Sequence, residues 1–507
     1  MSTPLTCREV VEFLWRYDMG WAIEEGIWYS PIVVYDLDGD GKAEVFCKAG
    51  EGDPRDSDGR VQSGPEYLLV LDGMTGLEKA RVDWPPREAF PSYNYASRNQ
   101  LAVAFLDGKT PCLIVVRGTY NVIQVRAYQY RAGELGELWR WSDDEEGGSY
   151  RGQGAHSMHA ADVDDDGRDE VFLGSAVLDD NGVGLWSTGL GHPDHHYVGD
   201  IDPNSPGLEV YYGIESRRDK NGCCLVEART GKVLWGLDRP TRHVHSTGMC
   251  ADIDGSVPGI ESYASDTDAE KKSNVRWLFD CRGNILRDDL DWGFGLRTVW
   301  WDADLQRELV QGRRIFKYGS DPDLDTVEGS VVGFADVLGD WREELIVSRA
   351  GELRIYSTTI PAKDRRVCLM QDPLYRMDVV VAAMGYYQVP MTSYDLATGE
   401  AKPLAPAHRG PHVRLSMREQ AYLPESDAPA EARVLTLSGD EFQRRMQAGL
   451  KIPDWYSFPE VLAELHRQTP PRERQGFTVL FTGLSGAGKS TLARALAARL
   501  MEMGGRS

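Results

Sequence analysis

The sequence predicts a mainly β protein: a β-propeller of seven to eight blades, followed by a small α/β fragment at the C-terminus. One acidic loop recurs between apolar, strand-like runs. Its seven starts lie between residues 36 and 336, and 300 residues divided by six steps give a mean step of 50 residues, as expected for propeller blades. Two Thr-Gly turns, Asp72–Gly76 and Ala228–Gly231, are typical of hairpins within a blade. The 14 tryptophans are suited to packing between blades.

The acidic loop has its clearest copies at Asp36–Glu44 and Asp162–Glu170. The looser copies and the weaker starts begin at Asp200, Asp252, Asp336, Asp107 and Asp302. In the two clear copies and the three looser ones, a closing Glu follows the first Asp by eight or nine positions. Glycine allows the sharp bend, so that carboxylates at alternate positions point to one centre.

Hard oxygen donors packed in this way are typical of a Ca²⁺ site, because Ca²⁺ takes six to eight oxygen ligands. The closing Glu comes at position 9 and strands flank the loop, so we expect a strand-turn-strand calcium site and not a helical one. The alternative is a solvated Asp-Gly turn without a metal. The predicted metal ligands are Asp36, Asp38, Asp40, Glu44, Asp162, Asp164, Asp166, Glu170, Asp200, Asp202, Glu209, Asp252, Asp254, Glu261, Asp336, Asp340 and Glu344.

Composition narrows the function classes. The net charge of -23 argues against general nucleic-acid binding and agrees with several carboxylate-bound cations. No apolar run is long enough to span a bilayer, and no basic segment followed by an apolar core opens the chain, so we expect a cytoplasmic protein without membrane contacts. The eight cysteines form no CxxC pairs, which favours reduced thiols.

The chain divides by composition into five parts: an N-terminal extension (1–30), the propeller (31–396), a linker (397–416), a helix-rich segment (417–470) and a strand-loop-helix segment (471–507). The linker is rich in Pro and Ala, which is typical of a connection between domains.

A phosphate-binding motif, GxxxxGK[ST], lies at Gly483–Ser490 between a predicted strand and a predicted helix. We expect Lys489 to reach the phosphates of ATP and Ser490 to hold Mg²⁺. The predicted nucleotide-binding residues are Gly483, Gly486, Gly488, Lys489, Ser490 and Thr491. No Mg²⁺-holding Asp, base or second substrate site follows in Thr491–Ser507, so we expect no kinase activity.

The tail resembles the junction of bifunctional sulfate adenylyltransferase/adenylylsulfate kinase. The stretch LSGDEFQRRMQAGLKIPDWYSFPEVLAEL (437–465) is similar to the end of the adenylyltransferase, and GFTVLFTGLSGAGKSTLARALAARLMEMGG (476–505) is similar to the start of the kinase. The resemblance implies a protein of sulfate activation whose active part would be this tail.

Residues from about 30 to 396 resemble the rhamnogalacturonan lyases built on an eight-bladed, calcium-rich β-propeller. The resemblance rests on YDLDGDGKAEV, GQGAH, ADVDDDGRDEV, DDNGVGLWSTGLGH, WWDADLQRELV and LGDWREEL, which occur in this order. It implies β-elimination at the galacturonate of a rhamnose–galacturonate backbone, with Ca²⁺ shaping the site and a polyuronide or related glycan as the partner. The same resemblance also allows a secreted protein.

That chemistry needs a neutralised uronate carboxylate, a base for the C5 proton and an acid for the leaving oxygen. Most of the ten histidines fall in the matching region between residues 156 and 245. The catalytic candidates are His192, His245 and Tyr386. The substrate-binding candidates are Arg98, Arg117, His156, Asp194, His196 and His243.

Three departures from the family pattern predict an altered substrate pocket. Tyr197 stands where the family has a second His, Asp325-Thr-Val-Glu328 replaces a polar Asn-Gly-Thr-Lys loop, and Val389-Pro-Met391 replaces Pro-Pro-His. Three hypotheses therefore remain: an active lyase, a propeller that binds a different sugar or lacks catalysis, and a sulfate-activation protein. The altered loop at residues 325–328 favours the second over the first.

Overall fold

The computed structural model describes residues 14–397, with gaps at 147, 246–247, 271, 289–296, 321, 365, 383 and 385–387, and the backbone of three short strands further on. The chain divides into two compact units, Met1–Gly410 and Pro411–Ser507. In the second unit, the described strands form one antiparallel sheet in the order β29-β28-β30. They are β28 (Val413–Ser416), β29 (Ala421–Pro424) and β30 (Val434–Leu435).

The described part of the first unit is mainly β, as predicted, and contains seven antiparallel sheets, six of four strands and one of three. Sheets one and two contain β1 (Ile32–Tyr35), β2 (Glu44–Gly50), β3 (Glu66–Asp72), β4 (Glu78–Asp83), β5 (Asn99–Ala104), β6 (Cys112–Arg117), β7 (Gln124–Arg131) and β8 (Glu134–Ser142). Sheets three and four contain β9 (Gly154–Ala161), β10 (Glu170–Gly174), β11 (Ala176–Leu178), β12 (Gly184–Ser187), β13 (Pro193–Gly199), β14 (Glu209–Ile214), β15 (Cys223–Glu227) and β16 (Val233–Gly236). Sheets five to seven contain β17 (Met249–Ala251), β18 (Glu261–Thr267), β19 (Ser273–Phe279), β20 (Ile285–Arg287), β21 (Arg297–Val299), β22 (Glu308–Gln311), β23 (Arg314–Phe316), β24 (Asp325–Thr326), β25 (Ser330–Ala335), β26 (Glu344–Arg349) and β27 (Glu352–Tyr356).

The repeated loop has one fixed place in this architecture. In every sheet it joins the first strand to the second, and in six sheets the closing Glu is the first residue of the second strand. In the second sheet Cys112 takes that position. The Thr-Gly turns at residues 72–76 and 228–231 join the third strand to the fourth, as predicted. The sequence repeat is therefore the structural repeat of the sheets.

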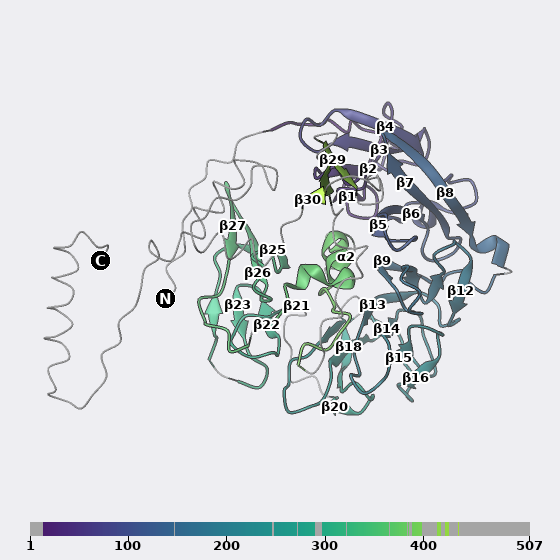
Figure 1. The fold of residues 1–507 in the computed structure, drawn as a ribbon. Coiled ribbons are helices and arrows are strands. Elements are labelled where there is room, and N and C mark those ends of the chain that lie inside the picture. The colour runs from purple at the N-terminus through teal and green to yellow at the C-terminus, as the bar shows by residue number, and fades with distance from the viewer. Residues whose placement is uncertain are drawn as a thin grey trace, which may run out of the picture. The chain divides into compact units, whose positions relative to one another are not determined.

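The sheets follow one another around a centre that holds helix α2 (Pro373–Val381), as Figure 1 shows. The first strands line this centre, and β5, β9 and β13 are buried along their whole length. Such continuous burial is expected of strands that are covered on both faces. Asp372 caps the helix by accepting from the Leu374 amide, and Pro373 begins it. The sequence analysis predicted only strands and turns here, because a nine-residue helix gives a weak periodic signal.

Tryptophans connect neighbouring sheets through one recurring contact. On β8, Trp139 donates from its indole to the Asp180 carbonyl of the next sheet, and Trp186 and Trp235 do the same to Ala228 and Cys281, each at 2.9 Å. The ring lies against a turn glycine with positive φ: Gly182, Gly231 and Gly283 respectively. Trp15, before the first sheet, repeats this contact with Gly73 and Gly76. The predicted role of tryptophan between blades is therefore seen in atomic contacts.

Two further observations concern expectations from composition. Within the described residues, no helix is long and apolar enough to cross a membrane. The seven cysteines in the same part of the chain are free thiols, and six of them are buried.

Candidate active site

The closing glutamates of the acidic loops make the same hydrogen bonds in six sheets. The Oε2 atom of Glu44 accepts from the Leu37 amide, and that of Glu170 accepts from the Val163 amide at 2.8 Å. The equivalent atoms of Glu209, Glu261, Glu308 and Glu344 each accept from two successive loop amides. The closing Glu thus holds the start of the loop through its Oε2 atom.

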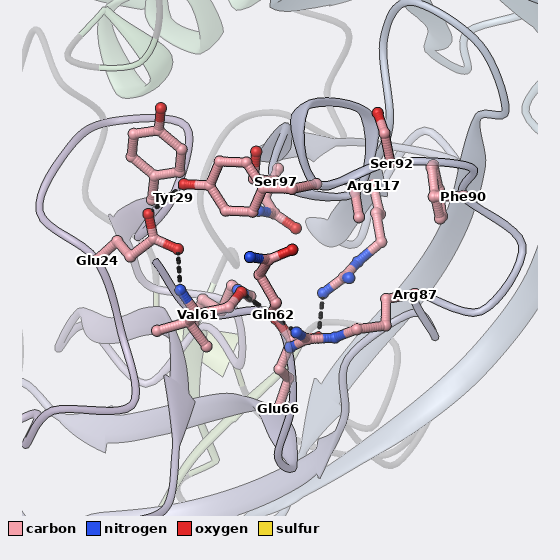
Figure 2. A pocket seen from close by; sticks show the side chains of 14 residues that line it. Glu24, Tyr29, Val61, Gln62, Glu66, Arg87, Phe90, Ser92, Ser97 and Arg117 are labelled. Carbon is pink, nitrogen blue, oxygen red and sulfur yellow. Dashed lines mark hydrogen bonds and ion pairs between the residues drawn. The ribbon is translucent and has the colours of Figure 1, made fainter. Parts of the chain in front are cut away.

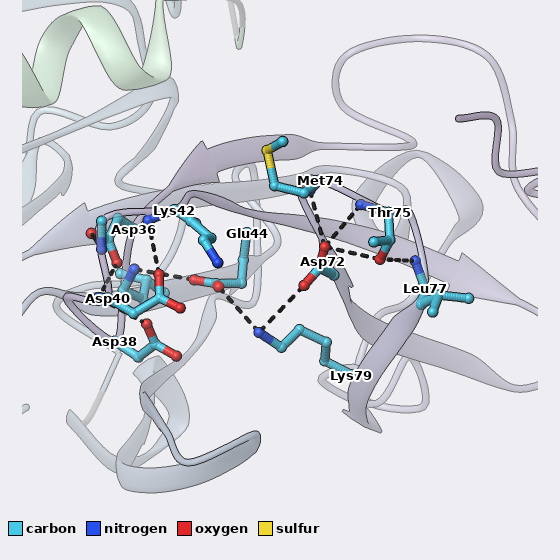
Figure 3. A network of polar contacts seen from close by, with 12 residues as sticks. Asp36, Asp38, Asp40, Lys42, Glu44, Asp72, Met74, Thr75, Leu77 and Lys79 are labelled. Carbon is cyan, nitrogen blue, oxygen red and sulfur yellow. Dashed lines mark hydrogen bonds and ion pairs between the residues drawn. The ribbon is translucent and has the colours of Figure 1, made fainter. Parts of the chain in front are cut away.

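Figure 3 shows the first of these loops, with Asp36, Asp38 and Asp40 on one side and Glu44 beside Lys79. Asp36 accepts from the amides of Gly39 and Gly41, so the backbone is wrapped around its carboxylate. Ligand atoms of three aspartates lie within 4.8 Å of one another in this loop: Asp36, Asp38 and Asp40. Two other acidic loops bring ligand atoms equally close together: those of Asp162, Asp164 and Glu170, and those of Asp302, Asp304 and Glu308.

Burial of these glutamates raises their pKa values. The pKa of Glu170 rises to about 8, that of Glu261 to about 9 and that of Glu209 to about 7, and neighbouring loop aspartates raise each further. A buried carboxyl with raised pKa needs a compensating cation in order to be charged at neutral pH. The donor set, hard oxygens around a bent loop, therefore fits a bound divalent cation.

One acidic loop contains a lysine ammonium group among its carboxylates. Nζ of Lys317 lies 2.8 Å from Asp302 Oδ2 and 3.3 Å from Glu308 Oε1, and it also contacts Asp304. Burial would lower the pKa of Lys317, but the hydrogen bonds to Asp302 and Asp304 outweigh this effect and raise it. The ammonium group therefore supplies positive charge at the centre of this loop.

A second group of titratable side chains gathers at the opposite edge of the sheets. His192 and Asp194 lie at the start of β13, whereas the acidic loop follows its end, and Glu215 directly follows β14. Residues Pro193 and Ile214 pair in the ladder, which brings these ends together. His156 lies near the start of β9 in the same way. A strand of seven residues spans roughly 20 Å, so this site lies well away from the acidic loops.

The core of this site is His156, His192 and Asp194, whose ligand atoms lie within 4.8 Å of one another. Nε2 of each His is 3.6 Å from Asp194 Oδ1, and His192 Nε2 is also 3.4 Å from Glu215 Oε2. His245 Nδ1 lies 3.4 Å from Asp194 Oδ2. All three core residues are buried. These distances to the carboxylates are longer than direct hydrogen bonds, whereas His156 Nε2 lies 2.9 Å from the Tyr120 hydroxyl.

The protonation states agree with a metal centre. His192 Nδ1 lies 2.5 Å from the Gly154 carbonyl and donates to it, so the lone pair is on Nε2, which is buried without a hydrogen-bond partner among the described residues. Burial and the neighbouring His192 lower the pKa of His156 to about 3, which keeps that imidazole neutral. Burial acts to raise the pKa of Asp194, but the adjacent histidines outweigh it and lower the pKa. Imidazole nitrogens beside a carboxylate form a donor set that can bind a divalent cation.

Aromatic side chains and one arginine border the cluster. The Trp28 ring centroid is 4.6 Å from that of His156, and Tyr120 lies edge-on to both His156 and His192. The Arg98 guanidinium lies over Trp28 and Tyr120 at 5.0 and 5.6 Å. Its Nε and Nη1 atoms have no hydrogen-bond partner in the described structure, so they can receive an anionic ligand.

The structure separates the predicted site residues into two groups. It brings together His156, His192, Asp194, His243, His245 and Arg98. Arg117 lies apart, paired with Glu66, and His196 is fully buried between His159 and Tyr212. Tyr386 lies outside the described residues. His196 faces away from the cluster although it stands two residues after Asp194, because the β13–β14 pairing is irregular between Pro193 and His195 and interrupts the alternation of side chains at Asp194.

Sequence reasoning missed three members of the site: Trp28, Tyr120 and Glu215. Glu215 had a signal, since it follows the strand that pairs with the one after His192. Trp28 and Tyr120 come from irregular segments and carry no such signal.

All three departures from the family pattern have a visible structural role. Val389 and Met391 are buried, and the Met391 amide donates to Asp378. Tyr197 is buried and donates from its hydroxyl to the Gly248 carbonyl at 2.9 Å. Glu328 accepts from Arg349 and Arg354 at 2.7 and 3.0 Å. The phosphate-binding motif at residues 483–490 lies outside the described residues.

Comparison with known proteins identifies relatives for both parts of the chain. The family model "Rhamnogalacturonan lyase family 11, C-terminal domain" matches residues 8–406. The rhamnogalacturonan endolyase YesW of Bacillus subtilis is 38% identical over 431 residues, which cover 78% of this chain and 67% of the relative. The rhamnogalacturonan exolyase YesX of the same organism is 37% identical over 439 residues, with 78% and 71% covered.

Solved structures agree with these matches. The crystal structure of YesW superposes with a TM-score of 0.71 at 37% identity, covering 77% of this chain and 71% of that one. The structure of YesX gives 0.72 at 36% identity, covering 78% and 72%. In the tail, the ATP-sulfurylase model matches residues 412–468 and the adenylylsulphate kinase model matches 475–507. A sulfate adenylyltransferase of Neurospora crassa is 47% identical over 93 residues, or 17% of this chain and 16% of the relative.

Proposed function

Because the chain belongs to rhamnogalacturonan lyase family 11, we propose that it cleaves a rhamnogalacturonan-type polyuronide by β-elimination at galacturonate. The observation that carries this proposal is the buried group of His156, His192 and Asp194 beside Glu215. Removal of a proton α to a carboxylate requires that the carboxylate charge be neutralised, and this cluster is suited to hold the cation that does so.

The donor set decides which residues would hold the metal. Nε2 of His192, both oxygens of Asp194 and the Glu215 carboxylate face the same space as His156. A bound divalent cation would act as a Lewis acid on the uronate carboxylate and increase the acidity of the C5 proton. His192, assigned a catalytic role from the sequence, is better suited to be a ligand because it is only 6% exposed.

The proton acceptor should be reachable from solvent, where the polymer enters. The side chain of His245 is 39% exposed and that of His243 is 23% exposed, in contrast to the buried core of the cluster. His245 beside the Asp194 carboxylate is therefore our candidate for the general base. Arg98, held over Trp28 and Tyr120, would bind a polymer carboxylate through Nε and Nη1, which have no hydrogen-bond partner among the described residues.

The acidic loops supply a second, structural role for cations. They lie at the far end of the strands from the histidine cluster, so calcium bound there would stiffen the sheets without touching substrate. The loop with Lys317 is the exception, because its ammonium would replace the metal. Calcium as the resident ion of the other loops is part of this proposal.

The decisive experiment is incubation of the full chain with rhamnogalacturonan I, following the ultraviolet absorbance of the unsaturated uronate product. We expect absorbance to rise only when a divalent cation is present, and to stay flat with the His192→Ala variant. The control is Lys220→Met, which removes an exposed ion pair with Asp238 outside the cluster. An active His192→Ala protein, or a wild-type chain inactive with every divalent cation tested, would contradict the proposal.

A further inference from the structure

A separate cavity lies between the first two sheets, at the same edge as the histidine cluster. It has a volume of about 200 Å³ and is lined by residues from the ends of β2 and β6, the start of β3 and the segment before β5. Pockets for drug-sized ligands measure roughly 300–1,000 Å³, so this one is suited to a single sugar ring. Figure 2 shows Glu66, Arg87 and Arg117 converging at its floor, with Tyr29 above.

The cavity floor carries more positive charge than negative. Lys48 Nζ lies 2.6 Å from Glu66 Oε1, while Arg87 and Arg117 approach Glu66 Oε2 at 2.7 and 2.5 Å. Three cations thus share one carboxylate. Glu24 also lines the cavity, but its oxygens accept from the Val61 amide and the Tyr93 hydroxyl.

The ion pairs at the cavity floor keep the Glu66 carboxylate ionised although it is buried. Burial acts to raise the pKa of Glu66, but Lys48 and Arg117 outweigh it and lower the pKa to about 2, so Glu66 stays ionised. Burial lowers the pKa of Lys48 to about 8. Arg117 is 1% exposed, and its Nε has no hydrogen-bond partner among the described residues. A buried guanidinium N–H without an acceptor is costly, which indicates that a ligand oxygen completes it.

The walls match the rest of a sugar. The rings of Tyr29 and Tyr93 stack at 6.4 Å between centroids, and Phe90 adds a third aromatic face. The cavity also adjoins the histidine cluster: Asn99, which lines it, donates to the Trp28 carbonyl at 2.9 Å, and Trp28 lies against His156. Aromatic walls over a few convergent polar groups are typical of carbohydrate-sized binding sites.

We propose that the cavity is a subsite for a galacturonate residue of the polymer other than the one that is cleaved, and that Arg87 and Arg117 bind its carboxylate. The inference rests on the proposed function for the identity of the polymer. It assigns a carboxylate-bearing sugar to a site that shares no residue with the histidine cluster. An anionic polymer in which galacturonate recurs can place one uronate at each site.

The test is a binding titration of the full chain in excess chelator, which removes any metal from the histidine cluster. D-galacturonate is the ligand, and its methyl ester, L-rhamnose and inorganic phosphate are the comparisons. We expect galacturonate to bind about tenfold more tightly than the ester or phosphate, since a charge-assisted bidentate contact is lost or mismatched in them. Equal binding of the ester would overturn the proposal. Tighter binding of phosphate would also overturn it, because the cavity would then be a general anion site and not a uronate subsite.

Two variants move the affinity in opposite directions. Arg87→Gln removes one partly exposed cation and should weaken galacturonate binding about tenfold, whereas Glu66→Gln removes the competing carboxylate and should strengthen it. The matched control is Arg314→Gln, an exposed arginine paired with Asp323 elsewhere. If Glu66→Gln does not fold, the galacturonate affinity of Arg87→Gln alone still tests the proposal, and an unchanged affinity would overturn it.

The same titration separates this inference from the proposed function. His192→Ala should leave galacturonate binding in chelator unchanged. Loss of binding in that variant would mean that galacturonate binds at the histidine cluster, and this would overturn the subsite. Galacturonate binding by a chain without lyase activity would refute the proposed function and leave the subsite standing. With active protein, Arg87→Gln should raise KM and leave kcat nearly unchanged.

Discussion

Nδ1 of His159, on the innermost strand β9, lies 2.6 Å from Oδ1 of Asp378 on the central helix α2. Its Nε2 lies 3.1 Å from the His196 carbonyl, so both nitrogens face acceptors and the ring carries both protons. Asp378 also accepts from the Met391 amide. This buried ion pair joins the helix to the sheets around it.

We expect Asp378→Asn to lower the free energy of unfolding by about 3–5 kcal/mol, because it leaves a buried charge without its partner. Urea unfolding measures this, with Asp323→Asn as an exposed control that should cost less than about 1 kcal/mol. Burial would lower the pKa of His159, but Asp378 outweighs it and raises the pKa above 6.5. The contribution of the pair is therefore complete below pH 6.5 and is lost as the pH rises through the folded-state pKa. A cost of Asp378→Asn that grows with pH would contradict this assignment.

Chelation should lower the melting temperature, and more so at higher pH. In the metal-free chain, Glu170 and Glu261 keep protons up to pKa values of about 8 and about 9, against an ordinary value of 4.5. Stability of the metal-free form therefore falls as the pH rises through this window, and calcium removes that loss by compensating the charges. Melting curves in Ca²⁺ and in EGTA at pH 5.5 and pH 8 should differ by several degrees more at the higher pH. Identical curves at both pH values would mean that no loop binds calcium tightly.

Lys317→Met should increase the calcium content of the protein by about one ion per chain, because it frees Asp302, Asp304 and Glu308 to bind a metal. Elemental analysis after dialysis against Ca²⁺ measures the content. Lys220→Met is the control, since that lysine pairs with Asp238 on the surface. An unchanged content in Lys317→Met would show that the ammonium does not stand in place of the ion.

Substitution of a buried histidine of the cluster and of an exposed one should have different effects on metal content and activity. His192→Ala should lose both bound metal and activity, whereas His245→Ala should keep the metal and lose kcat by about 10²–10⁴-fold, the usual contribution of a general base. Metal analysis together with steady-state kinetics separates the two effects. Full activity of His245→Ala would move the role of base to another residue.

Gly231→Ala should destabilise the protein by about 1–3 kcal/mol more than Gly133→Ala, because of overpacking. Both glycines have positive φ and sit in turns between third and fourth strands. A Cβ at Gly231 would meet the Trp186 ring at 2.7 Å, whereas nothing lies within 4 Å of one at Gly133. Thermal unfolding of the two variants compares them at equal backbone strain. Equal losses would mean that the tryptophan–glycine contact between sheets contributes little.

The sequence by itself determined the repeating part of this protein. A strand alternates its side chains and a bent acidic loop needs glycine and aspartate at set positions, so each repeat carries a local signal that survives without tertiary contacts. The positions of Asp36–Glu44 and Asp162–Glu170 between first and second strands follow from that local pattern. The histidines of residues 156–245 could be predicted as a group of site residues, because they precede or open successive inner strands.

Only the tertiary structure decided which of those histidines act together. His192 and Asp194 meet His156 because the inner strands of neighbouring sheets bring their starting ends to one edge, while His196, on the same strand as Asp194, faces the buried pair of His159 and Asp378. Arg117 stands at the end of β6, and its side chain pairs with Glu66. It is therefore separate from the histidine cluster. Such convergence depends on how neighbouring sheets lie beside one another, and no local pattern encodes it, because the partners lie tens to hundreds of residues apart.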